Sequence, residues 1–407
     1  MRSLVSLQHV PTYDPQSVLH AMRECLAPWG GMGAFVRPGQ RVLVKPNLLI
    51  GFAPEKAVTT HPAVVRAAIL LAQEAGGTVV VGDSPGVGRL ASAVRSAGLA
   101  PVLEETGVTL GDFTAPVEFD VPQHRVAARL TLSRAVTQAD VIITLPKLKT
   151  HGQMVFTGAL KNQFGLIPGT LKSQWHFRLQ RREWLAALLL DIHRAARPAL
   201  AIMDAVVGME GKGPSGGRPR PIGALLASPD LAALDTVACL LINLEPRLVP
   251  SLEAARREGA GATALSDIAV VGADWRALRV PDFENVSKLE DLRRILPLPS
   301  GILNWIREHW TARPRIVEAR CTQCGVCEEG CPVTPVAIHP DAPRPQQIDD
   351  DTCIRCYCCH EFCPNNAIDL YRPGLLGSLR RDPLAERCGG LASRLWPLSR
   401  RASNRKV

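Results

Sequence analysis

The sequence lacks several features that would assign it to common classes of protein. No run of 18 consecutive apolar residues is present, so a transmembrane helix is not predicted. The first 15 residues contain no long apolar segment of the kind found in signal peptides, and we expect a cytoplasmic protein. Aromatic residues make up only 5% of the 407 residues and form no recognised nucleic-acid-binding motif. Nucleic-acid binding is therefore not predicted, despite the net charge of +9.

Most of the net positive charge lies at the C-terminal end. Residues 372–407 contain nine basic and two acidic residues, a net charge of +7, which leaves +2 for the rest of the chain. This segment has no strong periodicity, and we expect a mobile, solvated tail. Contact of the tail with nucleic acid, anionic lipid or an acidic partner is the alternative.

Lysine is scarce, because 38 of the 47 basic residues are arginine. In such a chain, a position that keeps lysine can require a compact ammonium group rather than positive charge alone. Five of the nine lysines fall in the motif segments described below, which directs attention to those segments.

Cysteine is almost absent from the first 320 residues, where only Cys25 and Cys239 occur. Nine of the 12 cysteines lie between Cys321 and Cys363, and Cys388 follows in the tail. A disulfide scaffold would spread its cysteines along the chain, and the cytoplasm disfavours disulfides. Such dense local clustering indicates metal binding.

The clustered cysteines follow the pattern CxxCxxCxxxCP twice. Three cysteines at intervals of three wrap a loop around one face of an iron–sulfur cube, and the fourth, before proline, completes the other cluster. Structural zinc is disfavoured, because zinc sites use four ligands from paired CxxC motifs, whereas eight are supplied here. The two motifs consist of Cys321, Cys324, Cys327 and Cys331, and of Cys353, Cys356, Cys359 and Cys363.

This region resembles the bacterial two-cluster ferredoxins over about 57 residues. The resemblance implies two 4Fe–4S clusters, electron transport and a redox partner protein. Purely structural clusters are the alternative. Cys358 departs from the pattern; it is a free thiol, an alternative ligand or, the interpretation we favour, a small buried residue. The implied ligand sets are Cys321, Cys324, Cys327 and Cys363, and Cys353, Cys356, Cys359 and Cys331.

The first 300 residues alternate strand-like and helix-like patterns. This predicts an α/β fold with a mostly parallel sheet and helices on both faces, followed by a small ferredoxin-like α+β module. His61 is expected in a helix cap rather than as a ligand. Strands are predicted at 41–44, 78–81, 141–145, 199–203, 222–227 and 268–271, and helices at 61–75, 89–97, 174–197 and 230–244.

Polar residues gather where the predicted strands end, which is where open α/β sheets bind ligands. Lys147, Lys149 and His151 alternate along one segment, so an extended chain would place them on one side as ammonium donors and a general acid or base. A solvated basic loop is the alternative. The residues expected to bind a ligand or cofactor are Lys45, Asn47, Asp83, Lys161, Asn162 and Lys212.

Two glycine-rich segments border this set. Residues 211–218, GKGPSGGR, form a basic loop whose backbone N–H groups could hold a phosphate or carboxylate. Residues 82–88, GDSPGVG, lack the GxGxxG spacing of a dinucleotide site, and an ordinary tight turn is favoured there. The lysines and these loops together predict a site for a small anion, formed by Lys147, Lys149, His151, Lys161 and Lys212.

Six segments carry a second resemblance, to the family called domain of unknown function 362, which is often fused to a ferredoxin module. The resemblance covers residues 1–280 and implies the architecture but no reaction. We therefore expect an α/β domain at 1–295, a linker at 296–314, the two-cluster module at 315–371 and the tail at 372–407. The segments are VLVKPNLL (42–49), TTHPAVVRA (59–67), VGDSPG (81–86), PKLKTH (146–151), TGALKNQFG (157–165) and SPDLAALDTVA (228–238).

These patterns together favour an iron–sulfur redox protein, an oxidoreductase in which the ferredoxin-like module relays electrons between a partner and a ligand at the strand ends. Two alternatives stay open. One is a non-catalytic electron carrier with a docking domain, and the other is a non-redox anion-binding enzyme with structural clusters.

Overall fold

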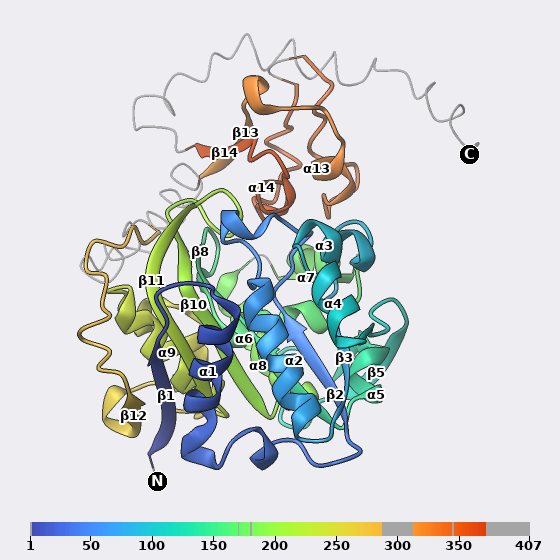
Figure 1. The fold of residues 1–407 in the computed structure, drawn as a ribbon. Coiled ribbons are helices and arrows are strands. Elements are labelled where there is room, and N and C mark those ends of the chain that lie inside the picture. The colour runs from blue at the N-terminus through green and yellow to red at the C-terminus, as the bar shows by residue number, and fades with distance from the viewer. Residues whose placement is uncertain (1, 170, 180, 287–311, 344–345, 372–407) are drawn as a thin grey trace.

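The computed structural model describes residues 2–286 and 312–371, apart from residues 170, 180, 344 and 345. The predicted tail at 372–407, and the predicted linker as far as residue 311, lie outside the described residues. Figure 1 shows a central sheet flanked by helices, with a small module at one end of the sheet.

The described residues contain one ten-stranded sheet, in which six of the nine strand pairings are parallel. Its strands are β1 (Ser3–His9), β2 (Arg41–Pro46), β3 (Thr78–Val81), β4 (Thr109–Leu110), β7 (Val141–Leu145), β8 (Lys147–His151), β9 (Val155–Thr157), β10 (Leu200–Glu210), β11 (Arg218–Ser228) and β12 (Ile268–Gly272). The order is β12-β1-β11-β10-β7-β2-β3-β4, and β8 pairs with β10 and β9. A separate hairpin joins β5 (Pro116–Asp120) to β6 (Arg129–Ser133).

Helices cover both faces of the sheet. They are α1 (Pro15–Leu26), α2 (Pro62–Glu74), α3 (Leu90–Ser96), α4 (Ala100–Thr106), α5 (Arg134–Gln138), α6 (Ala159–Asn162), α7 (Leu171–Arg178), α8 (Arg182–Ala196), α9 (Leu231–Leu241) and α10 (Pro250–Glu258). Because successive side chains of a strand point to opposite faces, Val42 and Val44 pack with α1 and α2, whereas Leu43 packs with α8. The predicted α/β fold with a mostly parallel sheet is confirmed.

Capping residues set where several of the predicted helices begin. His61 precedes α2, and its Nδ1 accepts a hydrogen bond from the backbone N–H of Ala63 at 3.2 Å. Asp230 caps α9 by accepting from the N–H groups of Ala232 and Ala233. The expected role of His61 as a cap is therefore confirmed.

The helix predicted at 174–197 is wrong as a single element. The chain forms α7 and α8 instead, because Arg181 adopts an extended conformation and begins a new helix. The buried face of α8 is formed by Leu185, Leu188 and Ile192, whereas Trp184 is 50% exposed. The predicted end at residue 197 is confirmed, since Arg197 leaves α8 in a left-handed conformation.

The cysteine-rich module is a small α+β unit. Its strands β13 (Arg313–Ile316) and β14 (Ile368–Tyr371) pair antiparallel, and its short helices are α13 (Val326–Glu329) and α14 (Cys358–Phe362). Strand β13 begins inside the segment expected to be linker. No helix in the described part of the chain is long and apolar enough to cross a membrane.

The module docks where the strands of the large sheet end (Figure 1). The ring of Phe362 lies directly over Gly86, at a point where a Cβ atom would overlap it. Nearby, the hydroxyl of Ser215 donates to the backbone oxygen of His360 at 3.2 Å. Both glycine-rich segments found in the sequence therefore contact the module, and Gly86 is required for its close approach.

Candidate functional site

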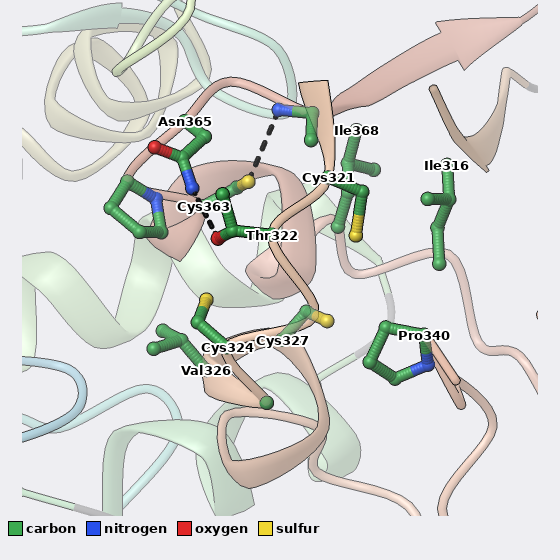
Figure 2. Close-up of a pocket in the computed structure, with 13 residues that line it drawn as sticks. Ile316, Cys321, Thr322, Cys324, Val326, Cys327, Pro340, Cys363, Asn365 and Ile368 are labelled. Atoms are coloured by element: carbon green, nitrogen blue, oxygen red, sulfur yellow. Dashed lines mark hydrogen bonds between the residues drawn. The ribbon is translucent and has the colours of Figure 1, made fainter. Parts of the chain in front are cut away.

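One set of cysteines surrounds a common cavity in the module. Figure 2 shows the sulfur atoms of Cys321, Cys324, Cys327 and Cys363 arranged around it. Three come from one motif and the fourth from the other, so the cavity joins the two halves of the module. This is the set that the ferredoxin resemblance assigns to a single cluster.

The other four cysteines also influence one another. Burial raises the pKa of Cys353 to about 11, and the neighbouring Cys356 and Cys331 add to that increase. Cys359 is buried, and its raised pKa reflects burial first and then Cys356, Cys353, Cys327 and Cys331. A metal ion displaces the proton of a coordinating thiol and stabilises the thiolate that burial alone disfavours, so these buried sulfurs fit a metal cofactor.

The arrangement of these thiols suits a multi-iron cluster. Among residues 2–286 and 312–371, no three His, Cys, Asp or Glu side chains converge closely enough to hold a single ion. The sulfurs instead enclose a space, as cysteines do around a cube of iron and sulfide. The residues present therefore fit a 4Fe–4S group.

Cys358 is fully buried and contacts a cysteine of the second set. A hydrogen bond from the Cys358 thiol lowers the pKa of Cys356. The structure thus places Cys358 as a buried neighbour of a predicted ligand, in agreement with the interpretation favoured from the sequence.

A second pocket lies between the strand ends of the large sheet and α14. The module contributes Glu361 and Phe362 to its lining. The large domain contributes, among others, Asn47, Asp83, Ser84, Lys149, Lys161, Asn162, Phe164, Lys172 and His176. Five residues predicted from the sequence to line the site, Asn47, Asp83, Lys149, Lys161 and Asn162, therefore lie together here.

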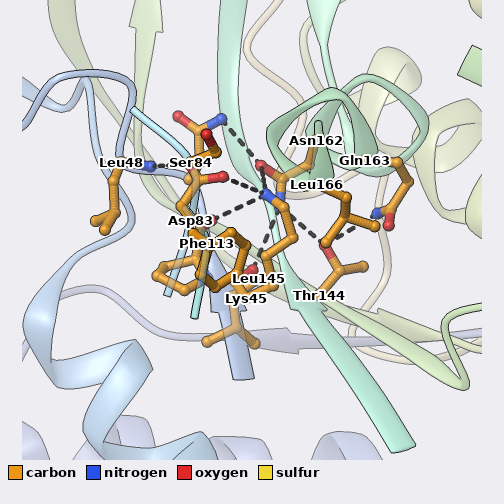
Figure 3. Close-up of polar contacts among 12 residues, drawn as sticks. Lys45, Leu48, Asp83, Ser84, Phe113, Thr144, Leu145, Asn162, Gln163 and Leu166 are labelled. Carbon is orange, nitrogen blue, oxygen red and sulfur yellow. Dashed lines mark hydrogen bonds and ion pairs between the residues drawn. The ribbon is translucent and has the colours of Figure 1, made fainter. Parts of the chain in front are cut away.

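A buried ion pair forms the floor of this pocket (Figure 3). Lys45 Nζ lies 2.9 Å from Asp83 Oδ1, and neither side chain is more than 5% exposed. Lys45 also donates to Asn162 Oδ1 at 3.3 Å, and Asp83 accepts from the N–H of Leu48 at 2.9 Å. Burial lowers the pKa of Lys45, and the charge of Asp83 opposes that change. Lys45 is thus held just below the pocket by partners of its own.

Two other lysines are buried and have no carboxylate at hydrogen-bond distance among the residues that the structure describes. Lys149 Nζ donates to Asn47 Oδ1 at 2.9 Å and to the backbone oxygen of Val58 at 2.8 Å. Lys172 donates to the backbone oxygen of Ser84. Burial lowers the pKa of each lysine to about 7. Both amines can therefore gain or lose a proton near neutral pH.

The carboxylate of Glu361 reaches into the pocket from α14. Its oxygens lie 3.8 Å from Lys161 Nζ and 3.7 Å from His151 Nε2, and its side chain is 10% exposed. Burial favours the neutral acid, but the ammonium of Lys161 outweighs it and holds the pKa of Glu361 well below its usual range. Glu361 is therefore an anion inside the site.

His151 is neutral and oriented by the backbone. Its Nδ1 accepts from the N–H groups of Gln153 and Met154 at 3.1 and 3.2 Å, so Nε2 carries the proton and faces Glu361. Burial, reinforced by Lys161, lowers the pKa of His151 to about 4. Nε2 has no hydrogen-bond partner among the described residues.

Lys147 does not line this pocket, although the sequence grouped it with Lys149 and His151. Its ammonium lies 2.8 Å from Asp204 Oδ2 and 2.7 Å from the hydroxyl of Tyr13. Tyr13 in turn donates to Asp204 and stacks on His61. Because Asp204 and Tyr13 satisfy it, Lys147 belongs to a separate, internally paired cluster.

Lys212 also lies elsewhere. Its side chain is 65% exposed, and Nζ pairs with Asp369 Oδ1 of β14 at 3.2 Å. The predicted anion-holding loop at 211–218 has two of its N–H groups already bonded, from Gly211 to Glu284 O and from Gly213 to Thr150 Oγ1. Lys212 does not line the pocket, whereas Pro214 of this loop does. The loop also contacts the module, where the hydroxyl of Ser215 donates to the backbone oxygen of His360.

Sequence reasoning missed several residues of the pocket. Lys172 was detectable, since the scarcity of lysine applies to it as to the others. Glu361 and Phe362 lie between the predicted cluster ligands Cys359 and Cys363, and only the cysteines of this segment were interpreted from the sequence. Asp235 was also missed; it accepts from the N–H groups of Ala159 and Leu160 at 2.6 and 3.1 Å and so fixes the start of α6.

The fold and these two sites define an iron–sulfur-binding α/β protein with a ferredoxin-like module. Residues 42–240 match the family described as Domain of unknown function (DUF362), and residues 347–369 match the 4Fe-4S binding domain. A thylakoid-associated protein of Synechocystis sp. is 39% identical over 264 residues, which are 64% of this chain and 81% of that protein. The chain belongs to the DUF362 family.

Two solved structures show weak overall similarity. One is the lactate racemase apoprotein from Thermoanaerobacterium thermosaccharolyticum, with 10% identity and a TM-score of 0.37 over 58% of this chain and 56% of that one. The other is a protein from Thermotoga maritima, with 12% identity and a TM-score of 0.34 over 52% and 55%. The chain thus spans little more than half the length of these two proteins.

Proposed function

We propose that this protein is a cytoplasmic iron–sulfur oxidoreductase whose ferredoxin-like module exchanges electrons with a small molecule held beneath α14. Each 4Fe–4S cluster supplies reversible one-electron transfer when bound. The two clusters would be held by Cys321, Cys324, Cys327 and Cys363, and by Cys353, Cys356, Cys359 and Cys331.

One observation carries this proposal. Helix α14 contains the predicted ligand Cys359 and ends next to the predicted ligand Cys363. Between these two cysteines, Glu361 and Phe362 line the pocket at the strand ends. A molecule in the pocket would therefore lie against the short helix that holds a predicted ligand of one cluster and is followed directly by a predicted ligand of the other.

The residues of the large domain supply complementary functions. Lys149 and Lys172 have pKa values of about 7, so each amine suits proton exchange with a molecule that gains or loses electrons. His151 stays neutral and faces Glu361, which suits it to a positioning role rather than to acid catalysis. Lys147 is not included among the proposed catalytic residues, because its ammonium group is already paired with Asp204 and hydrogen-bonded to Tyr13.

A redox partner protein is also part of the proposal. Cys324, on the rim of the first cysteine cavity, is exposed to solvent. Short separation between a donor and a cluster favours electron transfer, so this exposed edge suits docking of a partner.

The test is to reduce the anaerobically prepared protein, remove excess reductant and add a panel of small-molecule oxidants. We expect some compounds to reoxidise the wild-type clusters quickly and the Lys161→Met variant slowly. An outer-sphere oxidant that needs no pocket should reoxidise both equally. Lys212→Met, which alters a lysine outside the pocket, is the matched control.

The outcome separates this proposal from its alternatives. If no compound distinguishes wild type from Lys161→Met, the protein is better explained as an electron carrier with a docking domain. If compounds bind in the pocket while the clusters never change oxidation state, the clusters serve to hold α14 in place. The packing of Phe362 between Gly86 and Gly330 would favour that structural role.

A further inference from the structure

The pocket beneath α14 contains more positive than negative charge. Asp83 is matched by Lys45 at 2.9 Å. Three further lysines, Lys149, Lys161 and Lys172, line the pocket, and the one remaining carboxylate on its lining is Glu361. The histidines add no charge, since burial lowers the pKa of His151 and of His176 to about 4.

This excess charge is poorly accommodated by the protein itself. Lys149 and Lys172 are fully or nearly fully buried, and their contacts at hydrogen-bond distance are to uncharged oxygens. Burying an ammonium group without a counter-charge is unfavourable, and for this reason the pKa of each lysine falls to about 7. A bound anion would offset that cost and favour the protonated, charged form of both lysines. In addition, His176 Nδ1 is buried without a hydrogen-bond partner among the described residues, which leaves a polar atom for a ligand.

In the described part of the chain, Glu361 is the only carboxylate within 4.0 Å of Lys161 Nζ, and the contact is long. Its distances of 3.8 Å to Lys161 and 3.7 Å to His151 exceed those of good charge-assisted hydrogen bonds, which are about 2.7–2.9 Å. The carboxylate comes from the ferredoxin-like module, whereas both partners come from the large domain. An oxyanion in the pocket would compete with it for the same ammonium.

The size of the cavity limits what can bind. Its volume of about 50 Å³ accommodates roughly three to five waters at about 10–15 Å³ each. A ligand of about four or five non-hydrogen atoms fits this space, whereas typical drug-sized and nucleotide pockets are about 300–1,000 Å³. The rings of Phe164 and Phe362 form part of the wall, so the site also has an apolar side.

We propose that this pocket binds a small oxyanion, a short carboxylate or a phosphate, among Lys149, Lys161 and Lys172, and that Glu361 competes with the ligand for Lys161. The inference rests on the proposed function for the place of the ligand but concerns binding alone. The ferredoxin-like module thereby completes the binding site and sets its affinity.

The experiment is calorimetric titration of the oxidised, cluster-loaded full chain with sodium acetate and, separately, with sodium phosphate. Saturable heat with acetate identifies a carboxylate site, and heat with phosphate alone identifies a phosphate site. Absence of saturable binding of either probe up to about 10 mM would overturn the inference. Because reoxidation of the clusters is not measured, failure here is distinct from failure of electron transfer.

Three variants test the roles of the residues. Lys161→Met should abolish binding of whichever probe the wild type binds, and Lys212→Met should leave it unchanged. Glu361→Gln should strengthen binding, on the order of tenfold, because a competing charge is removed while the shape is kept. A merely structural Glu361 predicts weaker binding in this variant, and that result, or unchanged affinity, would overturn the competition.

Iron content and the midpoint of thermal unfolding show whether each variant is intact. If Glu361→Gln loses iron, Lys161→Gln provides the second measurement, since it removes the same ion pair from the other domain. Loss of binding in Lys161→Gln with full iron content supports the site, and retained binding overturns it.

Discussion

Oε1 of Glu361 lies 3.8 Å from the ammonium of Lys161, although the two residues belong to different modules of the chain. Glu361 lies two positions after the predicted cluster ligand Cys359, and Lys161 lies within α6, whose N-cap is Gly158. This contact joins the ferredoxin-like module to the strand ends of the large sheet. Several testable properties depend on that junction.

The first prediction concerns metal content. We expect about eight irons and eight sulfides per chain after anaerobic preparation, because the two cysteine motifs supply eight ligands. Cys358→Ala should retain all of this iron, since Cys358 contacts Cys356 rather than completing a ligand set. Cys356→Ser should lose about half. Elemental analysis and sulfide assay measure both, and about four irons in the wild type would contradict the two-cluster assignment.

The second prediction concerns the buried pair of Lys45 and Asp83. Lys45→Met leaves Asp83 without its partner in a site that is at most 5% exposed, and should destabilise the fold by about 3–5 kcal/mol. The thermal unfolding midpoint should fall clearly. Arg41→Met, which removes an exposed ion pair to Asp140, is the control and should change it little. Equal effects of the two variants would show that the buried pair has no special role.

Much of the sheet was predictable because its strands are short apolar runs with clear ends. Thr78–Val81 and Val141–Leu145 are strands with the predicted bounds. The break between α7 and α8 was not predictable, because the apolar spacing continues across it and no proline or glycine marks it. Periodicity reports the buried face of a helix but not a change in its direction.

The candidate site was predictable only in part, for a physical reason. Lys149 lies in β8, which directly follows the end of β7, and this position is fixed by local sequence. Lys212 follows a strand end too, yet its long side chain turns to Asp369 in the other module. Which way such a side chain points depends on how the modules dock. No local pattern in the sequence reports that docking.

The third prediction concerns pH. Burial lowers the pKa of Lys149 from 10.5 to about 7 in the folded protein, where Glu361, Lys161, Asp83 and Lys147 are the charged groups that influence it. Between about pH 7 and 9.5 the unfolded chain therefore binds the proton that the folded chain has released. The contribution of Lys149 to the free energy of unfolding therefore rises with pH across this window, by up to about 1.4 kcal/mol per pH unit.

Lys149→Met removes the group that titrates, so the wild type should gain stability relative to the variant as the pH rises from 7 to 9.5. Thermal unfolding midpoints of both proteins measured across the series provide the comparison. Lys172 has the same shift but is present in both proteins, so its contribution cancels. A difference between the two midpoints that stays constant with pH would show that Lys149 keeps an ordinary pKa.

The fourth prediction concerns Asp235, which accepts hydrogen bonds from the backbone N–H groups of Ala159 and Leu160. In the Asp235→Asn variant the side chain keeps its shape but can accept only one of these hydrogen bonds well. We expect the free energy of unfolding to fall by about 1–3 kcal/mol. Because α6 carries Lys161 and Asn162, binding of the oxyanion should weaken as well. Gly158→Ala should act in the same direction, since its added Cβ would overlap Asp235. Unchanged stability in both variants would contradict the capping role.

The last prediction tests the docking of the two modules at Gly86. An added side chain there would overlap the ring of Phe362, which is 5% exposed and also packs on Gly330. Gly86 is not among the residues with positive φ, so a larger residue acts through this contact and not through backbone strain. We therefore expect Gly86→Val to displace α14 from the strand ends. Hydrogen exchange should then rise in α14 and around Lys161, and oxyanion binding should be lost, while iron content stays the same because the cysteines lie within the module.

Gly33→Ala is the matched control, because a Cβ at Gly33 meets no atom within 4 Å. Wild-type exchange in α14 of Gly86→Val would show that the modules do not depend on this contact, and loss of iron would show that docking and cluster binding cannot be separated.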